Sequence, residues 1–391
     1  MIEALLVGMI AAVAYTYVGY PLLLVGLARR RDQTVSRESV LPTVSLVVSV
    51  YNGERIIQRK LENCRALDYP EDKLELIVAS DCSTDATHDI VARFAHPRLR
   101  LVASPTRLGK EAAQKRAAES ATGEIVVFTD AGILVDPPTL RYVAAHFADH
   151  RVGCVTGEDR VLNETGDVVG EGAYVRYETW LRRLESRVNS VVGMSGWLFA
   201  VRKSLCRDWP VGFASDFYML LNTVKAGYRG VCEPRAAAYS WVVPSHGQEL
   251  RRKIRTSTRG IAVLVAQRAL LNPIAYPVFA WQLISHKLLR WMVPFLLLGV
   301  FASSLALAPD GPVFRTLVAA QVLFYGIALL GYLLPSWRSA ALVRVPYFFC
   351  MSNLAILLAW GKYARGERFI VWEPTTRDGD RSRGAVTRER A

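Results

Sequence analysis

The chain has 391 residues, of which 51% are hydrophobic and 21% charged, and its formal net charge is +13. The high hydrophobic content excludes a disordered protein. Six cysteines without a C-x-x-C pair exclude a small disulfide-rich domain and a zinc ribbon. A positive mean hydropathy of +0.18 beside this basic charge indicates apolar, membrane-like segments together with a basic, solvated part.

The first predicted element is a transmembrane helix within residues 1–31. Residues 4–28 contain no charged residue and form a run long enough to cross the hydrocarbon core of a bilayer. Three arginines follow at 29–31, and positive charge favours the cytoplasmic side, so we expect the N-terminus outside and the next domain inside. A cleaved signal peptide would instead carry its basic residues before the apolar run.

Residues 40–265 are predicted to form a soluble domain in which strands and helices alternate. Strands are expected at 44–50, 74–79, 99–102 and 124–129, and helices at 55–66, 85–94 and 110–121. This alternation favours an α/β fold with a mostly parallel sheet that helices cover on both faces. Neither a G-x-G-x-x-G fingerprint nor a P-loop occurs, so the usual dinucleotide and P-loop phosphate sites are not expected.

Polar side chains follow three of the predicted strands, at the edge of the sheet where ligands of such folds bind. Asn52 and Glu54 follow the first strand, Asp81 and Asp85 follow the second, and Asp130 follows the fourth. Such groups can hydrogen-bond a nucleoside, and an acid at a strand end can hold a divalent cation that neutralises a diphosphate. An aspartate after a strand more often forms a turn or caps a helix, and for Asp85 the role of helix cap and the role in ligand binding are evenly balanced.

The C-terminal third is predicted to return to the membrane. Residues 270–291 mix aromatic and basic residues, as expected of an interfacial helix, and residues 292–361 form a transmembrane region that begins with a helical hairpin. The last segment of that region, 345–360, is a weaker candidate. If it spans, the basic tail at 362–391 lies outside, against the preference of positive charge for the cytoplasm. The segment is therefore re-entrant or interfacial, or the topology differs by one span; we expect a cytoplasmic tail.

Several motifs, taken in their order and spacing, resemble a known enzyme family. They are V-S-V-Y-N-G-E (48–54), S-D-C-S-T-D-A-T (80–87), R-L-G-K-E-A-A (107–113), F-T-D-A-G (128–132), G-M-S-G-W-L-F-A-V-R (193–202) and S-D-F-Y-M-L (215–220). Together they resemble family-2 glycosyltransferases, in the membrane-attached branch that includes polysaccharide synthases. The resemblance runs from Pro42 to Arg377 and implies a cytoplasmic GT-A domain (Rossmann-like, mostly parallel sheet) flanked by transmembrane helices.

The resemblance implies roles for the residues at the strand ends. Tyr51, Glu54 and Asp81 would hold the base and ribose of a nucleotide, and Lys110 would lie near the base or the diphosphate. Asp130 would be the metal-binding acid, with Mg²⁺ or Mn²⁺ as the expected cofactor. Glycine stands at position 132, where a second acid is expected.

Asp216 is the expected catalytic base. Inverting transfer needs a carboxylate that takes the proton from the attacking hydroxyl of the acceptor. The alternative is that Asp216 is only an acid favoured by the dipole at the start of a helix. Position 215, where the family usually has a further acid, holds serine.

Two further groups of residues complete the expected site. Donor and acceptor contacts are expected from a turn made of Gly193, Ser195, Gly196 and Trp197, with Trp197 equally able to be a core residue. Arg255 and Arg259 are expected to stabilise the leaving diphosphate. The alternative for these arginines is a basic helix that lies on anionic lipid.

We therefore expect a membrane-bound inverting glycosyltransferase that transfers a hexosyl or N-acetylhexosaminyl group in exopolysaccharide or cell-envelope glycan synthesis. Its partners would be a nucleotide-sugar donor (UDP is the usual nucleotide), a saccharide or lipid-linked acceptor, membrane lipids and other synthase subunits. The expected location is a bacterial-type inner membrane, crossed several times. No nucleic-acid partner is expected, because the basic residues cluster beside apolar segments. Gly132 and Ser215 leave one alternative, a degenerate transferase that only binds nucleotide or serves as a scaffold subunit.

Overall fold

The computed structural model describes residues 1–30, 41–163, 173–207, 209–241 and 246–369, and the chain divides into two compact units. The helical unit comprises Met1–Gly26, His246–Ile261 and Leu271–Glu367. The sheet unit comprises the rest of the described chain. Residues 246–261, which we predicted as part of the soluble domain, therefore group with the apolar helices.

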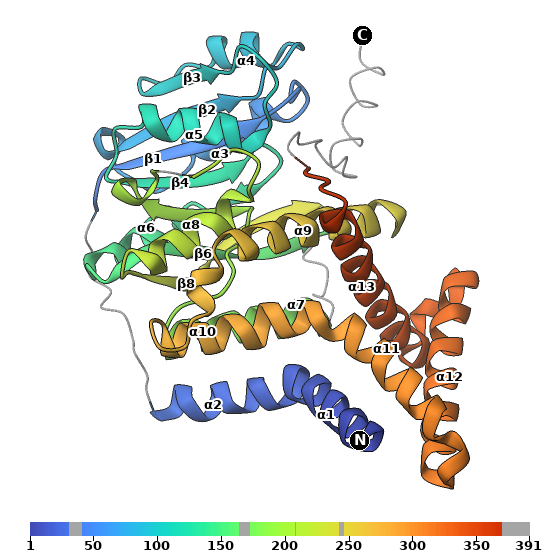
Figure 1. Ribbon diagram of the computed structural model, residues 1–391. Coiled ribbons are helices and arrows are strands. Elements are labelled where there is room, and N and C mark those ends of the chain that lie inside the picture. Colours follow the sequence, from blue (N-terminus) through green and yellow to red (C-terminus); the bar gives the residue numbers. More distant parts are fainter. Residues whose placement is uncertain (31–40, 164–172, 208, 242–245, 370–391) are drawn as a thin grey trace. The chain divides into compact units, whose positions relative to one another are not determined.

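The sheet unit is built on one sheet with the strand order β3-β2-β1-β4-β7-β6-β8-β5 (Figure 1). The strands are β1 Val44–Val50, β2 Leu74–Ser80, β3 Leu99–Ala103, β4 Ile125–Asp130, β5 Leu134–Val135, β6 Val152–Leu162, β7 Leu198–Arg202 and β8 Arg229–Trp241. Strands β1 to β4 pair in parallel, as predicted. In the other half β6 and β8 are parallel, β7 runs antiparallel to β4 and β6, and β5 runs antiparallel to β8, so the sheet is mostly parallel, as predicted, with two antiparallel strands.

Burial explains why the central strands form. Every residue of β1 and β2 is buried, which matches the continuous apolar runs that are typical of strands covered on both faces. The covering helices are α3 Ile57–Arg65, α4 Thr87–Arg93, α5 Lys110–Ser120, α6 Thr139–Ala145, α7 Ala173–Val188 and α8 Ser215–Lys225. Helix α5 packs on β1, β2 and β3, and α8 packs on β6 and β8. The α/β fold is confirmed.

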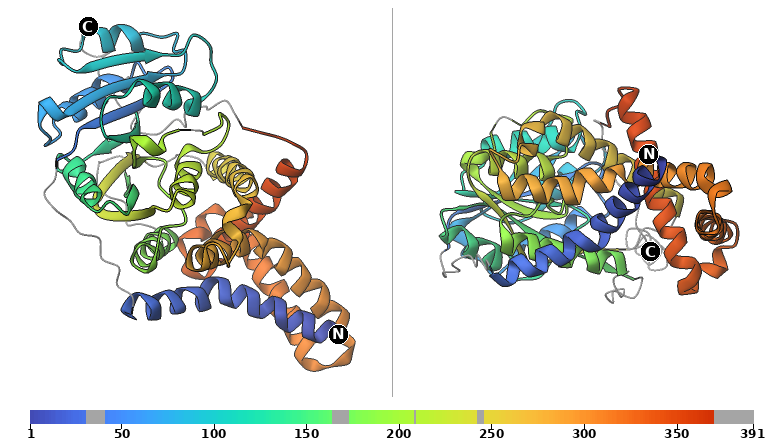
Figure 2. Two further views of the ribbon diagram at one scale, coloured as in Figure 1. Left: turned by 60° about the vertical axis from the view of Figure 1, so that its left-hand side comes forward. Right: turned by 60° about the horizontal axis from the view of Figure 1, so that its bottom comes forward.

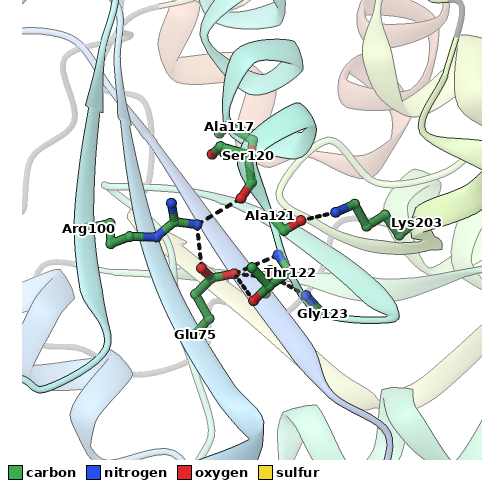
Figure 3. Close-up of polar contacts among 9 residues, drawn as sticks. Glu75, Arg100, Ala117, Ser120, Ala121, Thr122, Gly123 and Lys203 are labelled. Carbon is green, nitrogen blue, oxygen red and sulfur yellow. Dashed lines mark hydrogen bonds and ion pairs between the residues drawn. The ribbon is translucent and has the colours of Figure 1, made fainter.

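A polar network holds the amino ends of β1, β2 and β4 together, at the opposite end of these strands from the predicted site (Figure 3). Glu75 of β2 accepts hydrogen bonds from Ser45 Oγ at 2.6 Å and from Thr122 N at 3.0 Å, and it is ion-paired with Arg100. Burial raises the pKa of Glu75, but these hydrogen bonds outweigh it and lower the pKa below its usual value. The carboxylate thus fixes the turn between α5 and β4.

The helical unit contains four helices that, within the described residues, are long and apolar enough to cross a membrane. They are Ile2–Arg30, Pro277–Asp310, Pro312–Leu333 (α12) and Ala341–Ala364 (α13). Helix α9, His246–Ala266, precedes the last three. The predicted interfacial segment and the first helix of the predicted hairpin are continuous, because α10 (Pro277–Leu283), a π-helical turn (Ile284–Leu288) and α11 (Leu289–Leu307) follow one another without a break. At 1.5 Å per residue this helix is about 50 Å long, well over the roughly 30 Å of a hydrocarbon core.

The first apolar helix packs antiparallel to the Pro277–Asp310 helix (Figure 2). Leu6 contacts Val300 and Leu307, whereas Tyr15 OH, further along the chain, accepts a hydrogen bond from Trp281 Nε1 at 2.8 Å. The N-terminus therefore lies beside the end of α11.

Candidate active site

The loops that follow β1 and β2 interlock through hydrogen bonds. Asn52 N donates to Ser83 Oγ at 3.0 Å, and Thr84 N donates to Asn52 Oδ1 at 2.9 Å. Asn52 has a φ of 46°, a left-handed conformation that asparagine tolerates better than most residues. These contacts make a braced rim at the carboxyl ends of both strands.

Asp85 closes this rim and supports the start of α4. Its carboxylate accepts hydrogen bonds from Glu54 N at 2.9 Å and from Thr87 N at 3.1 Å. Partial burial raises the pKa of Asp85, but the hydrogen bonds from Thr87 and Glu54 outweigh it and lower the pKa below the usual value. These contacts support a structural role for Asp85 in the turn before α4, whose N-cap is Ala86. Glu54 itself is exposed and accepts a hydrogen bond from Ala86 N at 3.3 Å.

Asp81 lies buried at the end of β2 and holds the loop that leads into α5. Its carboxylate accepts hydrogen bonds from Leu108 N and Gly109 N, each at 3.0 Å. Gly109 has a φ of 96°, which a side chain would disfavour. The carboxylate therefore positions Lys110, the next residue. The predicted contact of Asp81 with a nucleotide stays a prediction. A carboxylate has about four acceptor sites, so the hydrogen bonds to the loop leave Asp81 able to accept more.

Tyr51, after β1, is stacked by an arginine that we did not predict. The Arg107 guanidinium carbon lies 3.8 Å from the centre of the Tyr51 ring, a close cation–π contact. Arg107 belongs to the same short loop as Leu108, Gly109 and Lys110. This loop, Arg107–Lys110, thus joins the predicted nucleotide-binding residues to the predicted metal-binding residue.

Lys110 connects two parts of the predicted site. Its Nζ lies 2.6 Å from Asp130 Oδ1, at the end of β4, and donates a hydrogen bond to the Gly196 carbonyl at 3.3 Å. The two charged side chains are 11% and 15% exposed, so this ion pair is largely shielded from water. The strand pairing explains why Gly196 and Asp130 lie close together. Because β7 runs antiparallel to β4, the turn before β7 lies at the carboxyl end of β4.

Asp216 lies against the same turn from the other side. It is the second residue of α8, and a methyl group placed on Gly196 would lie 3.4 Å from Asp216 Oδ2. The neighbouring Ser215 is buried and donates a hydrogen bond to Gln114 Oε1 at 2.7 Å, which ties the start of α8 to α5. The structure thus brings Lys110, Asp130 and Asp216 together around Gly196.

A second unpredicted residue, Asp159 of β6, holds the turn before β7. Asp159 accepts a hydrogen bond from Ser195 Oγ, and Ser195 N donates to Thr156 Oγ1 at 2.8 Å. Ser195 Oγ also accepts a hydrogen bond from Trp197 N at 3.0 Å, and the Trp197 side chain packs partly buried against the core, as one of our two interpretations expected. Gly193 is partly buried in the same turn.

Lys60 is a third residue that we did not predict, and it lies fully buried behind the end of β4. Its Nζ donates a hydrogen bond to the Ile133 carbonyl at 2.6 Å, and Ile133 N in turn donates to the Asp130 carbonyl at 3.0 Å. Burial lowers the pKa of Lys60, and the nearby Cys64 and Asp130 oppose this effect only in part. The lysine therefore fixes the turn that begins at the predicted metal-binding acid.

The predicted metal site offers one protein carboxylate. Position 132 is glycine, and no group of three or more His, Cys, Asp or Glu side chains within the described residues could hold a metal ion. A single carboxylate nevertheless suits a hard cation such as Mg²⁺, which usually keeps several waters and takes further oxygens from a substrate phosphate. The residues present therefore fit a cation that is held jointly by Asp130 and a diphosphate.

Arg255 and Arg259 lie on α9, in the part of that helix that belongs to the helical unit. Their contact with a diphosphate stays a prediction.

Comparisons with known proteins agree on the identity of the sheet unit. The family model for glycosyl transferase family 2 matches residues 45–222, which include every predicted site residue except the two arginines of α9. An N-acetylglucosaminyltransferase of Mesorhizobium japonicum is 26% identical over 245 residues, 55% of each chain. A poly-β-1,6-N-acetyl-D-glucosamine synthase of Staphylococcus epidermidis is 25% identical over 231 residues, 57% of this chain and 55% of that one. The chain spans about half the length of these curated relatives.

One solved structure matches almost the whole chain. It is a mannosyltransferase from Pyrobaculum calidifontis in complex with GDP-Man and Mn²⁺, which is 29% identical with a TM-score of 0.73. The match covers 94% of this chain and 100% of that one, and it confirms the predicted GT-A fold. On the family match and the fold, residues 45–222 form a glycosyl transferase family 2 domain.

Proposed function

We propose that the chain is a membrane-bound inverting glycosyltransferase. It transfers a sugar from a nucleotide sugar to a saccharide or lipid-linked acceptor in exopolysaccharide or cell-envelope glycan synthesis. The observation that carries the proposal is the meeting of a lysine and two carboxylates around one glycine: Lys110 bridges Asp130 and the Gly196 carbonyl, and Asp216 lies against Gly196.

The proposed reaction is a single displacement. The acceptor hydroxyl oxygen forms a bond to the anomeric carbon of the donor sugar as the bond from that carbon to the diphosphate breaks. The hydroxyl proton passes to the Asp216 carboxylate, and the nucleoside diphosphate leaves. Because the acceptor attacks the face opposite the leaving group, the anomeric configuration inverts. A divalent cation on Asp130 neutralises the diphosphate when bound, and Lys110 adds a positive charge to the same region.

The relatives suggest two classes of donor. Two of them are named for the transfer or polymerisation of N-acetylglucosamine, which favours a UDP-linked N-acetylhexosamine. The mannosyltransferase of similar structure holds GDP-Man, so a GDP-linked hexose is the second candidate.

Membrane attachment rests on the four apolar helices of the helical unit. We place the chain in a bacterial-type inner membrane, which it crosses several times, with the sheet unit on the cytoplasmic side. Arg29 and Arg30 end the first apolar helix and Arg31 follows it, which favours this orientation.

The structure gives little support to the alternative of a degenerate transferase. Ser215, which stands where the family usually has an acid, serves packing through its hydrogen bond to Gln114. Both of the carboxylates that the reaction needs, Asp130 and Asp216, are retained at the site.

The test is release of nucleoside diphosphate by the full chain in lipid vesicles. The vesicles receive a panel of UDP- and GDP-sugars with Mg²⁺ or Mn²⁺ and a mixture of saccharide and lipid-linked acceptors. We expect release from one donor class, its loss with a chelator, and a fall of at least 100-fold in Asp216→Asn and Asp130→Ala, whereas Asp89→Asn, an exposed acid on α4, stays near the parent. Saturable nucleotide binding without release, unaffected by either site variant, would establish the degenerate binding module instead.

A further inference from the structure

Helix α13 has the length and composition of a membrane span, but its contacts within the helical unit contradict a crossing. We propose that α13 lies along the cytoplasmic surface of the membrane, so that the chain after Ala364 stays on the side from which the hairpin of α11 and α12 enters. The proposal rests on the membrane attachment proposed above.

The hairpin of α11 and α12 provides a scale of depth. Gln321 Nε2 donates a hydrogen bond to Ser304 Oγ at 3.2 Å, and the rings of Phe301 and Tyr325 lie 6.3 Å apart. The two helices therefore run antiparallel from the link at 308–312. In this register Gly331 is level with the first two turns of α11, at the end of the hairpin far from the link.

Both ends of α13 contact this same end of the hairpin. Near its start, a methyl group placed on Gly331 would lie 2.9 Å from Val343 Cγ1. Near its end, Trp360 Nε1 donates a hydrogen bond to the Trp291 carbonyl at 3.0 Å, and its ring lies 6.3 Å from that of Phe295. The rise from Val343 to Trp360 is about 26 Å along a helix, so a helix parallel to the hairpin would end near the link instead.

The middle of α13 contacts a basic helix. Lys253 Nζ, on α9, donates a hydrogen bond to Ser352 Oγ at 3.0 Å. Helix α9 carries R-R-K-I-R-T-S-T-R at 251–259 and is not among the four apolar candidates. If α13 crossed the bilayer, Ser352 would lie near its centre, where a lysine is strongly disfavoured. The start and end of α13 therefore lie at one membrane surface, and its middle lies between the basic helix α9 and α12, where the Phe349 ring contacts Phe324.

Lipid is the partner that this surface helix fits. Near its start, the exposed apolar side chains Leu342 and Val345, at 75% and 63% exposure, share one face of the helix and would insert among the acyl chains. Lys362 and Arg365 follow in its last turn and at its end and share the ion-pair partner Glu367, which leaves a net positive charge at the level of anionic headgroups. This arrangement removes the conflict between a fourth span and a basic tail.

Protease accessibility tests the proposal in the full chain. One variant carries a specific protease site between Asp310 and Gly311, a second carries it after Ala391, and a third carries it before Met1 as a control, because Leu6 packs beside the link. Each variant is required to keep the activity of the parent, and each is probed in sealed right-side-out and inverted vesicles.

We expect the sites at the link and before Met1 to be cut only in right-side-out vesicles, and the site after Ala391 only in inverted ones. If the C-terminal site is cut in right-side-out vesicles together with the link, α13 spans and the inference is overturned while membrane attachment stands. If the link is cut in inverted vesicles, the hairpin does not cross as proposed, and the proposed orientation falls with it.

Discussion

Replacement of Lys110 by methionine should raise the affinity of the nucleotide-free protein for a divalent cation while it slows sugar transfer. The Lys110 ammonium group already occupies Asp130, the one carboxylate of the predicted metal site, at 2.6 Å. A cation must therefore displace or share this partner. Methionine keeps the length and apolar stem of the lysine but removes the competing charge.

The size of the effect follows from the geometry of the pair. At 2.6 Å and an effective dielectric constant of about 20, which suits a pair near the surface, the attraction is ~6 kcal/mol before desolvation. Desolvation and lost side-chain freedom cancel much of it, and a hydrogen bond to a charged group retains about 1.5–3 kcal/mol. Cation affinity should therefore rise roughly 10- to 150-fold, since each 1.4 kcal/mol is a factor of ten.

Titration with Mn²⁺, followed by electron paramagnetic resonance of the free ion, measures this affinity in the full chain. Lys115→Met is the matched control, because it makes the same charge change on the same helix one turn and a half further on. Diphosphate release should fall in Lys110→Met, because the lysine no longer helps to stabilise the leaving group. Unchanged or weaker Mn²⁺ binding in Lys110→Met would show that the ion pair does not compete with the cation.

Two further predictions concern the stability of the sheet unit. In Gly123→Ala the new methyl group would lie 2.6 Å from Ser45 N, against the backbone of β1. The melting temperature of this unit should therefore drop by about 2–12 °C. The control Gly26→Ala, whose methyl group would meet nothing within 4 Å, should leave the melting temperature unchanged. The hydrogen bonds from Arg151 lower the pKa of Asp149 to about 2 from the ordinary 3.8, so its stabilising contribution is present at neutral pH and is lost as the pH falls from about 4 to 2. Asp149→Asn should lower the melting temperature at pH 7 by a few degrees, with a smaller difference from the parent at pH 3; an equal difference at both pH values would contradict the assignment.

The parallel half of the sheet could be predicted because its strands are continuous apolar runs. Strand β1 was predicted at its observed limits, and β2 and β4 within a residue. Strands β6 and β8 were missed because they carry charged residues that are paired only in the folded chain. Glu158 of β6, for example, is buried by an ion pair with Arg183 of α7, 25 positions away. No local sequence pattern predicts such an ion pair.

The site was predictable where a motif marks it and not elsewhere. Their motifs pointed to Asp130 and Asp216, which the structure brings together around Gly196. Lys60 was missed although a signal existed: with Ile57, Leu61 and Cys64 it lies on the single buried stripe of α3, where a lysine has no place unless it is paired. Asp159 gave no such signal, because its contact with Ser195 depends on how two distant strands align.

The short loop from Arg107 to Lys110 has a thermodynamic consequence for the order in which ligands bind. One end of it stacks on Tyr51 and the other holds Asp130, with Asp81 clamping the backbone between them. A nucleotide that orders one end thus restricts the other, and the free energy of coupling between nucleotide and cation has to be the same whichever binds first. If the loop carries this coupling, Mn²⁺ strengthens UDP binding by the same factor by which UDP strengthens Mn²⁺ binding. Asp81→Asn, which removes the charge that holds the loop, then reduces both factors together.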